Sequence, residues 1–108
     1  SAPPEYLHNR IGAVFIPRNE QSDDLIAVVA NGSPASIAGV LDGDVLIQID
    51  DLKVSKWRTI PGILPLSRFW EMPAGTAHSI VLRRGQSLIT LNVVLKNILT
   101  EMPSKAAK

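Results

Sequence analysis

Residues 32–50 encode a short helix, a tight turn and an apolar strand in immediate succession. Ser33 can accept a hydrogen bond from a free amide of the first helical turn, and Pro34 occupies the first helical position without removing a donor that the helix needs. Gly39 can adopt the left-handed conformation that commonly ends a helix. The sequence therefore predicts a helix of about six residues that begins at Pro34.

A turn and a buried strand follow this helix. Asp42 and Gly43 form a favourable pair for a tight turn. Residues 45–49, Val-Leu-Ile-Gln-Ile, predict a largely buried strand with apolar side chains on both faces. A small sheet needs such a strand at its centre.

The chain of 108 residues has the size and composition of one globular domain, with 45% hydrophobic and 19% charged residues. Its net charge of +1 argues against a nucleic-acid surface, which depends on many basic side chains. The chain has no cysteine, which excludes disulfides, thiolate metal sites and a cysteine nucleophile. No apolar run approaches the roughly twenty residues that span a bilayer, so we expect no membrane insertion.

The remaining elements predict a mainly β protein of the α+β class. A second helix is expected from Pro65 to Trp70, with Leu66, Phe69 and Trp70 on one side. The other strands are expected at 11–16 and 25–29 and in a hairpin of 78–83 with 88–95. Five main strands and two helices predict a small barrel or sandwich that the helices cap. This domain is expected at 9–97, between a linker at 1–8 and a tail at 98–108.

Five short blocks of sequence together resemble a PDZ domain over residues 9–97. They are Arg-Ile-Gly-Ala at 10–13, Gly-Ser-Pro-Ala with Ala-Gly at 32–39, Gly-Asp-Val-Leu at 43–46, Pro-Ala-Gly-Thr at 73–76, and Ile-Val-Leu-Arg-Arg-Gly at 80–85. The order is similar to the bacterial, circularly permuted form, in which the strand that opens animal PDZ domains comes last. Such domains accompany high-temperature-requirement serine proteases, carboxy-terminal processing proteases and retropepsin-like aspartyl proteases, and residues 68–76 look most like the last group.

The resemblance implies a peptide-binding module. In PDZ domains a peptide adds as an extra strand to a free sheet edge beside the second helix. By this resemblance the amides of Ile11, Gly12 and Ala13 would bind a terminal carboxylate, with Arg10 as a nearby cation. The peptide groove would be lined by Phe15, Leu66, Phe69 and Trp70. The expected partners are protein C-termini or extended peptides and an attached protease, which implies an extracytoplasmic, periplasmic or envelope location.

Two departures from the family pattern keep an alternative open. Bacterial members usually carry an aromatic or aliphatic residue at the position of Arg10, and Pro61 and Pro65 interrupt the second helix. The chain could therefore be a non-binding structural or docking module whose groove is occluded. Gly12 likewise has two interpretations, close approach of a ligand carboxylate or a bulge at the strand end.

The residues do not predict catalysis, a metal or a cofactor. His8 and His78 are the two histidines, and they are expected in a linker and at a strand entrance rather than in a catalytic triad. The acids around Gly43 lack the ligand spacing of a calcium loop. Adjacent aspartates at 23–24 and 50–51 point apart, and no Asp-Thr-Gly triplet is present. We expect the fragment itself to be non-catalytic.

Overall fold

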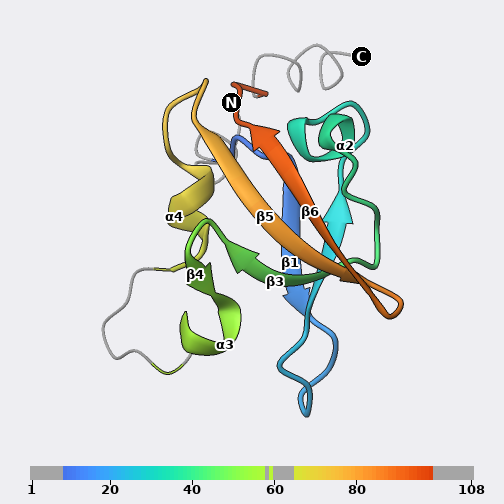
Figure 1. Cartoon of the computed structure of the whole chain (residues 1–108). Helices are drawn as coiled ribbons and strands as arrows, with labels where there is room; N and C mark the ends of the chain where they lie inside the picture. The colour runs from blue at the N-terminus through green and yellow to red at the C-terminus, as the bar shows by residue number, and fades with distance from the viewer. Residues whose placement is uncertain (1–8, 58, 60–64, 99–108) are drawn as a thin grey trace.

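The computed structural model describes residues 9–57, 59 and 65–98 and has the mainly β architecture expected for the α+β class. Its described residues form an antiparallel sheet of six strands in the order β1-β2-β3-β5-β6, with β4 paired to β3 (Figure 1). The strands are β1 Ala13–Pro17, β2 Leu25–Val29, β3 Val45–Ile49, β4 Leu52–Lys53, β5 Ala77–Arg84 and β6 Ser87–Val94. The described helices are α2 Pro34–Ala38, α3 Val54–Trp57 and α4 Ser67–Trp70. The predicted linker at 1–8, most of the tail at 98–108 and Pro61 lie outside the described residues.

The helix α2 confirms the capping signals in the sequence. Ser33 has extended backbone angles, and its side chain accepts from the Ser36 amide at 3.2 Å. Gly39 ends the helix in the left-handed region with φ 109°, and its N–H donates to the carbonyls of Ala35 and Ser36. The helix contacts β6. These local signals therefore determine where α2 begins and where it ends.

Other predicted elements differ from the structure at their boundaries. The strands at 25–29 and 45–49 are confirmed, but the first strand begins at Ala13 rather than Ile11, because Gly12 turns the backbone with φ 74°. The second helix is shorter than expected, because it begins at Ser67 rather than Pro65, although the Arg68 amide still donates to the Pro65 carbonyl at 3.0 Å. The short helix α3 was not predicted.

The core lies between the sheet and the short helices. Buried side chains come from β1, β2, β3, β5 and β6, and Trp70 of α4 joins them with 4% of its surface exposed. The cluster contains Ile11, Ala13, Leu25, Ala27, Ala35, Val40, Leu46, Ile49, Val54, Trp70, Ile80, Leu82, Val93 and Leu95. The beginning of β1 and the end of α4 thus belong to one packed unit.

An ion pair between a buried carboxylate and a partly exposed guanidinium connects the turn before β3 to the end of β5. The carboxylate of Asp44 is 2% exposed and accepts two hydrogen bonds from Arg84, at 2.8 Å from Nε and 2.7 Å from Nη2. It also accepts from the Leu41 amide at 2.9 Å, and Arg84 donates a further bond to the Gly39 carbonyl. This pair stabilises the junction of α2, β3 and β5, since each buried polar atom has a partner.

Candidate functional site

The strand β1 lies at one edge of the sheet, and its inner side pairs with β2 (Figure 1). The register places Val14 opposite Val28 and Ile16 opposite Ile26. The Ala30 amide donates to the Gly12 carbonyl at 2.9 Å, so the backbone of Gly12 points toward β2. Because backbone groups alternate along an antiparallel strand, those of Val14 and Ile16 also point toward β2.

The same alternation directs the N–H and C=O groups of Ala13 and Phe15 away from β2. Within the described ranges no strand pairs with this outer edge of β1. Pro17, which has no N–H, ends the strand. The edge therefore offers a short row of backbone donors and acceptors, centred on Phe15.

The two faces of β1 have different surroundings. Ala13 is 4% exposed and Phe15 packs partly against the core, so these side chains share the inner face. The side chains of Val14 and Ile16 lie on the opposite face of the strand, which faces solvent, and are 48% and 49% exposed. A strand added to this edge would meet apolar side chains on both faces.

The helix α4 flanks the inner face of β1. The Phe15 and Trp70 ring centroids lie 5.8 Å apart, and those of Phe69 and Trp70 lie 6.2 Å apart. Leu66 is partly buried against the same core cluster. The structure thus brings Phe15, Phe69 and Trp70 together, while Trp70 is a core residue with little exposed surface.

Asn9 binds the backbone loop for which a carboxylate-binding role was expected. Its Oδ1 accepts hydrogen bonds from the amides of Ile11 at 3.2 Å and Gly12 at 3.0 Å. Its Nδ2 donates to the Ala13 carbonyl at 3.1 Å, on the outer edge of β1. Sequence reasoning missed Asn9, although an asparagine just before a turn often bonds the backbone two or three residues on.

The guanidinium of Arg10 is bound within the domain. Its Nε donates to Asn97 Oδ1 at 2.7 Å, and Nη1 donates to the carbonyls of Glu71 at 2.7 Å and Met72 at 3.3 Å. The Arg10 amide donates to the Trp70 carbonyl at 2.9 Å. Arg10 therefore joins the start of β1 to the end of α4 and to the segment after β6.

Gly12 lies where the loop packs closely on the start of α2. A Cβ atom at this position would lie 2.2 Å from Ser33 Cβ, which no side chain can occupy without displacement. The Ala35 amide also donates to the Ile11 carbonyl at 2.9 Å. Contact with Ser33 is thus by itself a sufficient reason for glycine at position 12.

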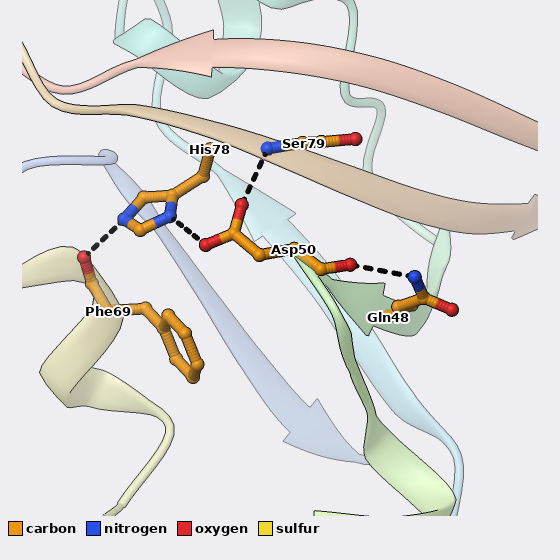
Figure 2. Close-up of polar contacts among 5 residues, drawn as sticks. All are labelled: Gln48, Asp50, Phe69, His78 and Ser79. Carbon is orange, nitrogen blue, oxygen red and sulfur yellow. Dashed lines mark hydrogen bonds and ion pairs between the residues drawn. The ribbon is translucent and has the colours of Figure 1, made fainter.

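A second polar cluster holds α4 against β3 and β5, as Figure 2 shows. The imidazole of His78 is 2% exposed, with Nδ1 at 2.7 Å from Asp50 Oδ2 and Nε2 at 2.9 Å from the Phe69 carbonyl. The Ser79 amide donates to Asp50 Oδ1 at 3.0 Å, and Gln48 Nε2 donates to the Asp50 carbonyl at 2.7 Å. The tautomer with hydrogen on Nε2 satisfies the Phe69 carbonyl, which only accepts.

This cluster has the geometry of a structural support. The rings of Phe69 and Trp70 meet the His78 ring edge-on at 5.6 and 5.8 Å. The imidazole of His78 bonds a carboxylate and a backbone carbonyl rather than a hydroxyl or thiol that it could activate as a nucleophile, and His8 lies outside the described residues. The cluster fixes the helix that flanks β1.

The described residues contain neither a metal-binding cluster nor a helix that could span a membrane. Among residues 9–57, 59 and 65–98, no three histidines or acids gather in a way that could hold a metal ion. Every helix in that part of the chain is too short or too polar to cross a membrane. No protein-family model matches the chain, and no curated protein matches it.

Proposed function

We propose that the chain is a PDZ-type peptide-binding module that captures C-termini or extended segments by adding them as a strand to the outer edge of β1. Through this binding it regulates an attached protease or presents substrate to it. The observation that carries the proposal is the outward-facing backbone of Ala13 and Phe15, at an edge that no described strand pairs. The resemblance of the five sequence blocks to PDZ domains supports the link to proteases and to an extracytoplasmic location.

The chemistry of this edge suits strand addition. An antiparallel peptide would exchange hydrogen bonds with the N–H and C=O of Phe15 and accept from the N–H of Ala13. Each such bond contributes about 0.5–1.5 kcal/mol net, and apolar burial on Phe15, Val14 and Ile16 adds about 25 cal/mol per Å². Because association itself costs at least about 4 kcal/mol, we expect modest affinity and fast exchange.

The test is a titration of isotope-labelled protein with a random-sequence peptide library, monitored by amide chemical shifts. The amides of Ala13 and Phe15 should shift, because they point toward the added strand. The amides of Val14 and Ile16 are matched internal controls on the same strand, since they already pair with β2. Absence of shifts, or shifts confined to the β6 edge, would contradict the proposal.

A docking module with an occluded groove is the second candidate. Two observations favour it: Asn9 already binds the loop amides, and Trp70 is 4% exposed beside Phe15. In that case the same titration would leave β1 unchanged, whereas a fused catalytic domain would slow amide exchange at Ala13 and Phe15, whose N–H groups point away from β2. Hydrogen exchange on the free and the fused chain separates these two functions.

A further inference from the structure

The side chain of Asn9 occupies the same backbone groups that the end of a bound peptide would use. One oxygen accepts from two loop amides, Ile11 and Gly12, and the amide nitrogen donates to the Ala13 carbonyl. A carboxylate has only acceptor oxygens and could replace the first two bonds but not the third.

The nearest cation does not compensate for this occupancy. Arg10 is the charged residue adjoining the loop, and its guanidinium already donates to Glu71, Met72 and Asn97. A terminal carboxylate would therefore have to displace Asn9 from two amides, or draw Arg10 away from three acceptors. Either change breaks hydrogen bonds that already exist within the domain, so a carboxylate gains less from this loop than it would from free amides.

The part of the edge beyond Asn9 has no such obstacle. The N–H of Ala13 and both backbone groups of Phe15 face outward, and Asn9 bonds only the Ala13 carbonyl in this row. A peptide bond within a chain supplies one donor and one acceptor and suits these groups. Pro17 has no N–H, so it ends the row of hydrogen-bonding groups at the other end of β1. A few residues of an extended segment are therefore enough to pair with this row.

We infer that the β1 edge binds internal extended segments of proteins and discriminates against free C-termini, because Asn9 occupies the loop amides. This inference rests on the proposed function, since it concerns the ligand class of the same edge. Asn9 acts as a specificity-determining residue. It occupies the loop amides that a carboxylate would need and leaves the N–H of Ala13 and both backbone groups of Phe15 accessible.

The experiment uses short random segments displayed either between fixed flanking sequences or with a free C-terminus. The best-binding segment is then synthesised twice, once ending in a carboxylate and once ending in a carboxamide, and dissociation constants are measured at one ionic strength. Wild-type protein should select binders in the internal format and bind the two synthetic peptides within about twofold of each other. This comparison needs no variant.

Variants at position 9 then test the cause. In Asn9→Ala the two amides are free, so the carboxylate peptide should bind at least about tenfold more tightly than the carboxamide. In the isosteric Asn9→Asp the oxygen still caps the amides and adds a negative charge, so no preference for carboxylate should arise. Circular dichroism of both variants confirms that they are folded.

The failures of the two proposals are distinguishable. If wild-type protein prefers the carboxylate peptide by about tenfold or more, the inference is wrong while strand addition stands. If Asn9→Ala folds and shows no gain for the carboxylate, Asn9 does not set the ligand class. If neither format yields a binder to wild-type protein, the proposed function fails, and the inference fails with it.

Discussion

Replacing Gly12 with alanine should destabilise the domain much more than the same change at Gly32. The two glycines have nearly the same positive φ, 74° and 72°. A methyl group at Gly32 meets nothing within 4 Å, whereas at Gly12 it would lie 2.2 Å from Ser33 Cβ. The pair therefore separates backbone strain from steric conflict in one fold.

The magnitudes follow from these two geometries. Each alanine pays roughly 1–2 kcal/mol for the left-handed conformation. Gly12→Ala adds about 1–3 kcal/mol of overpacking, and moving Ser33 endangers the cap of α2, which contributes about 1 kcal/mol. We expect losses in free energy of unfolding of about 1–2 kcal/mol for Gly32→Ala and about 3–6 kcal/mol for Gly12→Ala.

Urea denaturation followed by tryptophan fluorescence measures both losses, because Trp70 is buried in the core. In the double variant Gly12→Ala/Ser33→Gly the second change removes the clashing Cβ. Its loss should therefore be smaller than the sum of the two single losses. Equal losses for Gly12→Ala and Gly32→Ala, within about 0.5 kcal/mol, would refute the argument from close packing.

Two further perturbations test the polar clusters. Burial raises the pKa of Asp44, but the hydrogen bond from Arg84, the Leu41 amide and the Arg84 charge outweigh it and lower the pKa below its usual value. Wild-type protein should therefore lose stability from pH of about 4 downward, as Asp44 protonates, and Asp44→Asn should flatten this slope in urea titrations at several pH values. His78→Leu should lower the free energy of unfolding by about 1–3 kcal/mol, since the Phe69 carbonyl loses its donor. An unchanged urea midpoint would show that His78 does not stabilise the position of α4.

The sequence was sufficient to predict those elements whose conformation depends on a few consecutive residues. The cap at Ser33, the proline at the first helical position and the left-handed Gly39 lie within seven consecutive positions, and they specify α2 without reference to the rest of the chain. The strands at 25–29 and 45–49 were predictable for a similar reason, because runs of apolar residues favour buried strands. Such preferences depend on residues that are adjacent in the sequence.

The candidate site was only partly predictable. The resemblance identified the loop around Gly12 and named Phe15, Phe69 and Trp70, whose rings the structure brings together. The side chain that binds the loop amides, Asn9, was missed, and so were the acceptors of Arg10, which are 61 and 87 positions away. Several arrangements of a flexible polar side chain satisfy the same sequence, and packing selects one of them.

The order of residues along the chain was enough to specify the helix cap, the turns and the inward and outward faces of the strands, since these depend on backbone geometry over a few residues. Tertiary packing decided that β1 and β6 are the end strands of the described sheet, which partners Asp44 and His78 find, and that Trp70 enters the core. These outcomes depend on groups from distant segments competing for the same space and the same hydrogen bonds. That competition is resolved only when the whole sheet is assembled.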